Sequence, residues 1–376
     1  MSTTPPPPPA AAVARFRCPG CSAGMEFDPA TGGLNCAYCG NAQKISHPVN
    51  TRVEELPLAD YVGAGAGSRL RRLAEQALEV TCAGCGSTVQ FAPPEVAGVC
   101  PFCAAPIVAQ PQSANPEVAP NGLLPFGLEK RAATTSIQSW LSSRWFAPNA
   151  LKSVARPEGI HGVYVPFWTY DAETWSAYTG ARGDYYYETE YVNVQNARGE
   201  VERQARQVRH TRWTSVSGNV ENRFDDVLVP ASRAIDEKRL RDLAPWDLDA
   251  VAPYEPAYLS GFKAQRYQVE IGDGFETAKV IMQSSIQHSV LADIGGDEQQ
   301  VRSLDTRWNN VTFKHVLLPV WIGAYRFQGK VFQVTVNART GEVQGERPYS
   351  ALKIALAVIA AAILIAVIYW LASEPR

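Results

Sequence analysis

Two segments in the second half of the chain carry apolar residues at the spacing of an α-helix. They are residues 129–146 and 275–294, and in the second segment the apolar positions recur every four residues. Such a stripe predicts a helix that buries one face. Gly295-Gly296 follows directly and predicts the helix end, because glycine readily adopts the left-handed conformation of a C-terminal cap. Residues 234–243 predict a shorter helix. The stripes consist of Ile137, Trp140, Leu141 and Trp145, and of Ala278, Met282, Ile286 and Val290.

Aromatic and β-branched residues dominate the segments around these helices, as is typical of strands. Residues 164–178 and 185–194 predict two strands. Residues 316–327 and 330–336 predict two more, and Gln328-Gly329 between them is a tight-turn signal. Strands joined by tight turns pair antiparallel. The pattern therefore predicts an α+β domain over residues 127–348 with antiparallel strands.

A short sequence occurs twice within this domain. Val165-Pro166-Phe167-Trp168 recurs in altered form as Leu318-Pro319-Val320-Trp321, and each copy opens a strand after a helical stretch. The repeat predicts an internal duplication of a unit made of one helix and its following strands.

The last part of the chain is continuously apolar. Residues 354–372 are nineteen residues without a charge or a proline, long enough to cross a hydrocarbon core of about 30 Å. A buried core helix is the alternative, but such a helix seldom lacks polar positions. We therefore predict one transmembrane helix over 351–372, which makes the chain tail-anchored. Arg347 and Lys353 flank its near end, and Tyr369 and Trp370 lie near its far end. This arrangement places the soluble body on the cytoplasmic side of the cell membrane.

The remaining chain divides by composition. A Pro/Ala-rich lead has the low complexity of a disordered segment. Two cysteine-containing units follow, separated by a connector whose helical spacing predicts a short helix, and a proline-rich linker precedes the α+β domain. The boundaries are 1–14 for the lead, 15–48 for the first unit, 49–79 for the connector, 80–108 for the second unit and 109–126 for the linker.

All eight cysteines lie in these two units, and each belongs to a C-x-x-C pair. In both units fourteen residues separate the two pairs, enough for a hairpin that brings both pairs onto one metal ion. Four thiolates form a closed tetrahedral shell, which is typical of structural zinc. The sequence therefore predicts two Zn²⁺ ions per chain. The predicted ligands are Cys18, Cys21, Cys36 and Cys39 in the first unit, and Cys82, Cys85, Cys100 and Cys103 in the second.

Other chemistry can use paired cysteines. A disulfide framework needs an oxidising compartment, and the N-terminal residues contain no secretory signal pattern. A redox C-x-x-C normally comes singly beside a βαβ pattern. Iron bound as in rubredoxin has the same ligand spacing, so spacing alone does not separate it from zinc. The units also share Phe27 and Phe91, and Pro29 and Pro93, at equivalent positions. Each phenylalanine is expected to pack beside a metal, which supplies most of the folding energy of so small a unit.

Charge does little to identify a partner. The formal net charge is −2, so the whole molecule exerts no attraction for polyanions. One basic run, residues 198–212 beside Trp213, has the charge to bind phosphates or anionic lipid headgroups, although a solvated strand or hairpin explains it as well. The chain contains no phosphate-binding loop, no zinc-protease helix motif and no nucleophile elbow. We therefore predict no enzymatic activity and no catalytic or cofactor-binding residues.

The paired C-x-x-C units, the two Pro-Phe-Trp-like strand openings and the terminal helix together resemble a group of bacterial tail-anchored proteins. Members carry two zinc ribbons of the transcription-factor-IIB type and are often labelled as primosomal protein N′ (replication factor Y) or helicase-like. The resemblance implies zinc, a membrane anchor and a replication-related role. A helicase also needs a nucleotide-binding loop, which this chain lacks, so that activity does not carry over.

Taken together, these features predict a membrane-tethered cytoplasmic protein that acts as a binding or adaptor module for protein partners. A nucleic-acid-binding protein held at the membrane is the alternative. An enzyme of unrecognised type in the α+β domain is a third class, since fold does not determine function.

Overall fold

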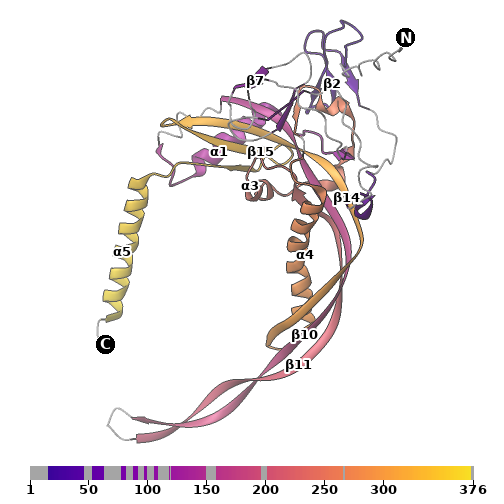
Figure 1. The fold of residues 1–376 in the computed structure, drawn as a ribbon. Coiled ribbons are helices and arrows are strands. Elements are labelled where there is room, and N and C mark those ends of the chain that lie inside the picture. The colour runs from indigo at the N-terminus through magenta and orange to yellow at the C-terminus, as the bar shows by residue number, and fades with distance from the viewer. Residues whose placement is uncertain are drawn as a thin grey trace.

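The fold is that of a computed structural model, in which the chain forms a compact head, a long curved arm and a separate terminal helix (Figure 1). The described residues are 16–45, 53–62, 78–81, 88–91, 97–99, 106–108, 118, 120–149, 158–195, 201–265 and 267–373.

A large, mainly antiparallel sheet organises the chain, as the strand pattern predicted. Its strands follow the order β11-β10-β14-β15-β16. Three of them are very long, with 38 residues in β10, 30 in β11 and 30 in β14. The bounds are β10 (Glu158–Gln195), β11 (Val201–Pro230), β14 (Glu298–Phe327), β15 (Lys330–Asn337) and β16 (Val343–Gly345).

One continuous strand, β10, replaces the two strands predicted at 164–178 and 185–194. The glycines between them do not form a turn. A Cβ on Gly180 would lie 2.4 Å from the carbonyl oxygen of Gln300, and one on Gly183 would lie 2.7 Å from Cγ2 of Thr211. These glycines therefore permit close approach of the neighbouring strands.

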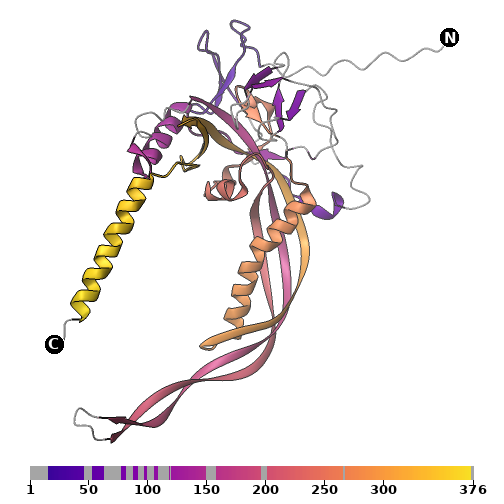
Figure 2. The same cartoon turned by 60° about the vertical axis from the view of Figure 1, so that its left-hand side comes forward.

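Among the described helices, α1 (Lys130–Ser143) and α4 (Ile271–Ile294) pack on one face of the sheet and α3 (Glu237–Asp242) packs on the other. Helix α4 lies inside the curve of the long strands (Figures 1 and 2). Its buried residues recur every four positions, which confirms the predicted stripe. Gly295 follows with a φ of 63°, and its N–H donates to the carbonyl oxygen of Leu291. The helix therefore ends at the glycine that the sequence predicted as its C-terminal cap.

Twice along the chain a helix is followed by two strands of the large sheet. One unit is α1 followed by β10 and β11, and the other is α4 followed by β14 and β15. The repeated tetrapeptides lie side by side on the two central strands, where Val165 pairs with Leu318. The two tetrapeptides therefore lie next to each other in the sheet, and the internal duplication stays a prediction.

The connector and the linker each contribute a short strand to the large sheet, whereas the residues at which the connector helix was predicted lie largely outside the described residues. Strand β4 (Leu56–Pro57) pairs with β14, and β9 (Gly122–Leu123) pairs with both β14 and β12 (Ala252–Pro253). Each segment is only two residues long, too short to give a periodic signal. Strand β13 (Lys263–Ala264) adds a parallel pairing with β10. The 3₁₀ helices within the described residues are η1 (Leu58–Asp60), η3 (Leu248–Ala250) and η4 (Pro256–Leu259).

The first cysteine unit is a small three-stranded antiparallel sheet in the head. Its strands are β1 (Glu26–Asp28), β2 (Gly33–Asn35) and β3 (Ala42–Lys44). In the second unit two pairs of antiparallel strands are described. They are β5 (Leu78–Thr81) with β6 (Thr88–Phe91), and β7 (Ala97–Val99) with β8 (Pro106–Val108).

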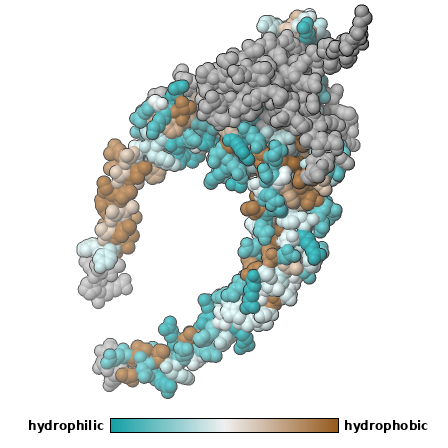
Figure 3. Space-filling model, in the orientation of Figure 1, coloured by the Kyte–Doolittle hydropathy of each residue, from teal (hydrophilic) through white to brown (hydrophobic). Residues whose placement is uncertain are grey.

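The two projecting elements leave the head on the same side (Figures 1 and 2). The arm is the hairpin of β10 and β11 beyond the point where β14 begins. Helix α5 (Ala351–Ser373) is the other projection. In Figure 3 the described part of α5 is mostly apolar, whereas polar side chains predominate on the arm. Within the described residues α5 is the one helix long and apolar enough to cross a membrane, and none of its apolar stretch is buried in the protein.

Candidate functional site

The first four-cysteine cluster is built from two turns of the same geometry. In each turn the N–H of the residue four positions after the first cysteine bonds back to that cysteine's carbonyl group. These bonds are Ser22 to Cys18 at 2.8 Å and Gly40 to Cys36 at 2.9 Å. Ser22 and Gly40 both have positive φ, 61° and 73°. The turns therefore present each C-x-x-C pair in the same way, from opposite sides of one centre.

The sulfur positions suit a tetrahedral metal ion. Sγ of Cys18 lies 3.3 Å from Sγ of Cys39, and Sγ of Cys21 lies 3.5 Å from Sγ of Cys36. All four sulfurs lie within 4.8 Å of one another. A disulfide requires about 2.05 Å. A Zn–S distance of about 2.3 Å in a tetrahedron separates sulfurs by about 3.8 Å, so small shifts of the side chains accommodate zinc.

Ionisation of the thiols also points to a cation. Burial raises the pKa of Cys18, but hydrogen bonds from Cys39 and from the backbone N–H groups of Gly20 and Cys21 lower it to about 6. The N–H of Asn41 lowers the pKa of Cys39, yet the neighbouring thiols raise it to about 12. Four adjacent thiolates repel one another, so complete ionisation needs a positive ion among them. Cys18 and Cys36 are buried, which closes the site on one side.

The second predicted ligand set falls outside the described residues. Cys82 and Cys85 belong to the segment that connects β5 to β6, and Cys100 and Cys103 belong to the segment that connects β7 to β8. One cluster of four cysteines that could hold a metal ion is therefore described, and both the identity of its metal as zinc and a second ion stay predictions.

The first unit packs firmly on the head. Phe27 is 4% exposed, and its ring lies 5.1 Å from that of Tyr258, in an edge-on arrangement. The backbone N–H of Phe27 bonds to the carbonyl oxygen of Ser260 at 2.9 Å, and the Ser260 hydroxyl donates to the carbonyl oxygen of Met25 at 2.6 Å. The four-cysteine cluster therefore belongs to a unit that packs against the α+β domain through these contacts.

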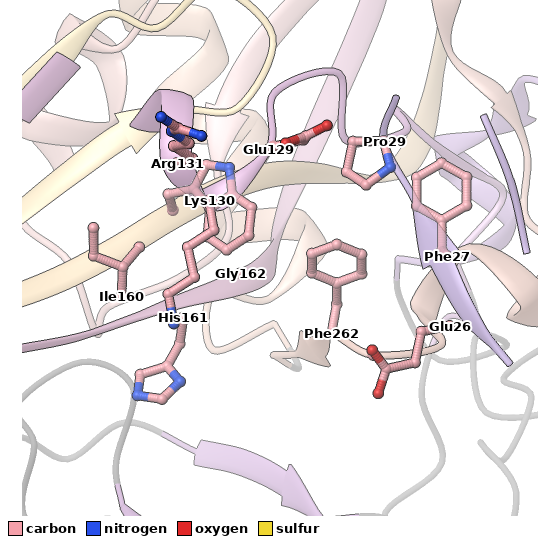
Figure 4. Close-up of a pocket in the computed structure, with 12 residues that line it drawn as sticks. Glu26, Phe27, Pro29, Glu129, Lys130, Arg131, Ile160, His161, Gly162 and Phe262 are labelled. Atoms are coloured by element: carbon pink, nitrogen blue, oxygen red, sulfur yellow. The ribbon is translucent and has the colours of Figure 1, made fainter. Parts of the chain in front are cut away.

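An open pocket of about 640 Å³ lies along this junction (Figure 4). The amine of Lys130 points toward the imidazole of His161 on one side, and Phe27 and Glu26 line the other. Burial lowers the pKa of His161, and the charges of Lys263 and Lys130 lower it further. His161 therefore stays neutral near pH 7, and no catalytic pair is evident around this pocket.

Three further acids lie close together where the connector meets the sheet. Carboxylate oxygens of Glu55, Asp171 and Asp225 lie within 4.8 Å of one another. The amine of Lys314 lies 3.3 Å from Glu55 and 2.7 Å from Asp226. Burial raises the pKa of Asp171 to about 6, and the nearby acids add to this effect. Because Lys314 already supplies a positive charge, this arrangement is an ion-pair network rather than a metal site.

The base of α5 is surrounded by exposed aromatic residues. Trp145 and Phe146 follow α1 and are 75% and 39% exposed, and Tyr349, just before α5, is 61% exposed. Lys353 fixes this arrangement, because its amine donates to the carbonyl oxygens of Trp145 at 3.0 Å and Ala147 at 2.8 Å. The helical spacing of residues 129–146 predicted Trp145 as part of the buried stripe. The prediction was wrong because α1 ends at Ser143.

The basic run 198–212 was interpreted either as a binding site for phosphates or anionic lipid headgroups or as a solvated strand or hairpin, and its described part lies on the arm. The described residues of the run, 201–212, form the outer end of β11. Sequence reasoning missed that tyrosines of β10 lie beneath them. The guanidinium carbon of Arg209 lies 4.2 Å from the ring centre of Tyr185, and that of Arg203 lies 5.1 Å from the ring centre of Tyr191.

Comparison with known proteins yields one informative similarity. The chain is 26% identical over 346 residues to the uncharacterized protein YdjG of Bacillus subtilis (strain 168), and the match covers 91% of this chain and 92% of that protein. No family model matches the chain. No solved structure matches it either. The relative's name states no activity, so the function has to be argued from the geometry.

Proposed function

We propose that this protein is a membrane-tethered adaptor that binds partner proteins and catalyses no reaction. The observation that carries the proposal is helix α5. It spans Ala351–Ser373, about 34 Å at 1.5 Å per residue, and its apolar side chains are exposed on all sides. Water solvates such a surface poorly, whereas a bilayer of about 30 Å solvates it well.

The base of α5 supports the same proposal. Trp145, Phe146 and Tyr349 are large, exposed and grouped where the helix leaves the head. Arg347 lies among them, with its guanidinium carbon 5.4 Å from the ring centre of Tyr349. Aromatic and basic residues are typical of the membrane interface, and the basic ones favour the cytoplasmic side. The head and the metal cluster would then face the cytoplasm, where thiols stay reduced.

The metal cluster fits a structural role in such an adaptor. Four cysteines leave no open coordination position for a substrate or water. Zinc would hold the two turns together and so maintain the surface of the first unit. A second zinc ion in the second unit, bound as its cysteine spacing predicts, would do the same there. Together the units present small, rigid binding surfaces at the end of the head.

The alternative is nucleic-acid binding at the membrane, which the resemblance to replication-related proteins suggests. The arginines of the arm are the observation that favours it, since they have the charge to contact phosphates. However, Tyr185 and Tyr191 already stack against Arg209 and Arg203. Ring faces that are covered in this way are less available for stacking with bases. We therefore favour protein partners.

Arginine substitutions in α5 test the tether. Each arginine at the centre of a spanning helix costs about 2.5–3.5 kcal/mol of insertion free energy. The double variant Ala361→Arg/Leu364→Arg should therefore move the protein from the membrane to the soluble fraction. Its matched control, Ala361→Leu/Leu364→Ala, keeps the composition of the helix and should stay in the membrane. Retention of the arginine variant after washing in salt and carbonate would contradict the tether.

Affinity capture from solubilised membranes tests the adaptor role. Protein partners should be recovered with the wild type, both before and after nuclease treatment. They should be reduced in a variant that lacks the first metal site, if the ribbon surface contributes. Recovery that nuclease abolishes would support the nucleic-acid alternative instead.

A further inference from the structure

The outer part of the arm is a two-stranded ribbon with both faces free of described helices. Residues 184–195 of β10 pair with residues 201–212 of β11, from Asp184 opposite Arg212 to Gln195 opposite Val201. At about 3.4 Å per residue this ribbon is roughly 40 Å long. The third strand, β14, begins at Glu298 opposite Gly183, and α4 ends at Ile294. Because this ribbon is exposed on both faces, it adds little buried apolar surface to the core of the protein.

The strand register separates the charges of the ribbon onto its two faces. Residues directly opposite each other in an antiparallel pair point to the same face, and alternate residues point to opposite faces. One face, which we call the tyrosine face, therefore carries two arginines and no acid, a charge of +2. The other, the glutamate face, carries four acids and two arginines, a charge of −2.

The charged residues and tyrosines of the two faces are as follows. The tyrosine face has Tyr185, Tyr187, Tyr191, Arg203 and Arg209. The glutamate face has Asp184, Glu188, Glu190, Glu202, Arg206 and Arg212, together with Tyr186 and His210.

The composition of the tyrosine face is typical of a protein-binding surface. Tyrosine and arginine are the residues that most often dominate binding energy at protein interfaces, whereas lysine is depleted there. The described ribbon contains no lysine. Tyr187 and Tyr191 are each 62% exposed. The guanidinium groups held over Tyr185 and Tyr191 keep their N–H donors available for carboxylates.

We propose that the tyrosine face of one arm docks onto the glutamate face of the arm of a second copy of this chain. Charge complementarity favours a second copy as the partner. Arg203 and Arg209 on the tyrosine face of one copy can pair with the carboxylates on the glutamate face of the other. Valines lie between those carboxylates, at Val192, Val194 and Val208, and offer apolar surface to the tyrosines. Two ribbons of identical twist stack as the sheets of a sandwich do.

This contact joins different faces, so each arm can bind one neighbour on each side. A heterologous contact of this kind continues into a row instead of closing as a dimer. A ribbon two strands wide, about 10 Å, and about 40 Å long offers roughly 400 Å² on one face, which is less than the roughly 800 Å² per partner of a stable soluble complex. The inference therefore rests on the proposed tether, which confines copies to one plane and raises their effective concentration.

Photo-crosslinking of the full chain in liposomes tests this inference. The photoreactive residue p-benzoylphenylalanine replaces Tyr187, and equal amounts of ¹⁴N- and ¹⁵N-labelled protein are mixed before reconstitution. Crosslinks between differently labelled copies should join the photoreactive residue at position 187 of one copy to peptides within 184–195 or 201–212 of the other. Species larger than dimers should form. Crosslinks only to lipid, only to other regions of the protein, or to added single-stranded oligonucleotide in preference to the arm would overturn the inference.

Charge reversal supplies the specific control. Arg203→Glu/Arg209→Glu should reduce the crosslink at least tenfold, and so should Glu188→Arg/Glu190→Arg. The combination of all four substitutions exchanges the two charge patterns and should restore the crosslink. Arg233→Glu/Arg326→Glu lies outside the arm and lowers the net charge as much as Arg203→Glu/Arg209→Glu does. This control should leave the crosslink yield unchanged. Failure of the fourfold variant to recover would overturn the inference. Fractionation of each sample shows independently whether the tether itself is intact.

Discussion

Zinc binding and docking of the first unit should be separable by two substitutions, because they depend on free energies of different size. Cys36→Ser removes one of four ligands to an ion whose binding contributes about 10–16 kcal/mol in small zinc units. Phe27→Ala removes a ring that packs against the head. Truncation of a buried phenylalanine costs about 3–5 kcal/mol, which is well below the free energy of metal binding.

The expected outcomes follow from this difference. Cys36→Ser should lower the zinc content of the full chain from two ions to one and also release the first unit from the head. Phe27→Ala should keep both ions, because the two cysteine turns are closed by their own backbone hydrogen bonds. It should lose only the docking, since the contact of its ring with Tyr258 at 5.1 Å disappears.

Two measurements distinguish the variants. Metal analysis gives the zinc-to-protein ratio, and hydrogen exchange of the peptide that contains Ser260 reports docking, because Ser260 bonds to Met25 and Phe27 across the junction. Both variants should raise the exchange of this peptide. Phe27→Leu, which keeps most of the apolar surface, is the control and should raise it less. Loss of zinc in Phe27→Ala, or two ions retained in Cys36→Ser, would refute the reasoning.

Three further predictions concern the sheet and the base of α5. The pKa of Asp171, raised by burial to about 6, means that the folded state holds this proton more tightly than the unfolded state. The stability of the wild type relative to Asp171→Asn should therefore fall by up to about 3 kcal/mol between pH 4 and pH 7, as measured by chemical denaturation. A Cβ on Gly274 would lie 2.4 Å from the hydroxyl of Tyr170, so Gly274→Val should destabilise the fold by about 1–3 kcal/mol. Gly272→Val is the control, because its nearest neighbour lies 3.8 Å away. Trp145→Phe should reduce the quenching of tryptophan fluorescence by lipids brominated near the headgroup in nanodiscs, and unchanged quenching would place that loop outside the membrane interface.

Local pattern determined several features of this protein. The stripe of α4, its glycine cap, the antiparallel strands and the apolar helix α5 all correspond to predictions made from residue periodicity and length. Each of these features depends on neighbours a few positions apart in the chain, and periodicity reports such neighbours directly. The first cysteine cluster also depends on residues that are close in the chain, because a hairpin of fourteen residues brings its two ends together almost regardless of context. Its members are Cys18, Cys21, Cys36 and Cys39.

Tertiary structure decided the features that join distant parts of the chain. The continuity of β10 depends on neighbouring strands that approach Gly180 and Gly183, and the entry of the connector depends on a pairing of only two residues. The ion pair of Glu55 with Lys314 joins residues 259 positions apart. Likewise, the separation of charge on the arm follows from the register of β10 against β11. A one-residue shift would place the same arginines and tyrosines on opposite faces. The sequence by itself therefore predicts most helices, several strands and the first four-cysteine cluster, whereas long-range pairing decides which side chains share a surface.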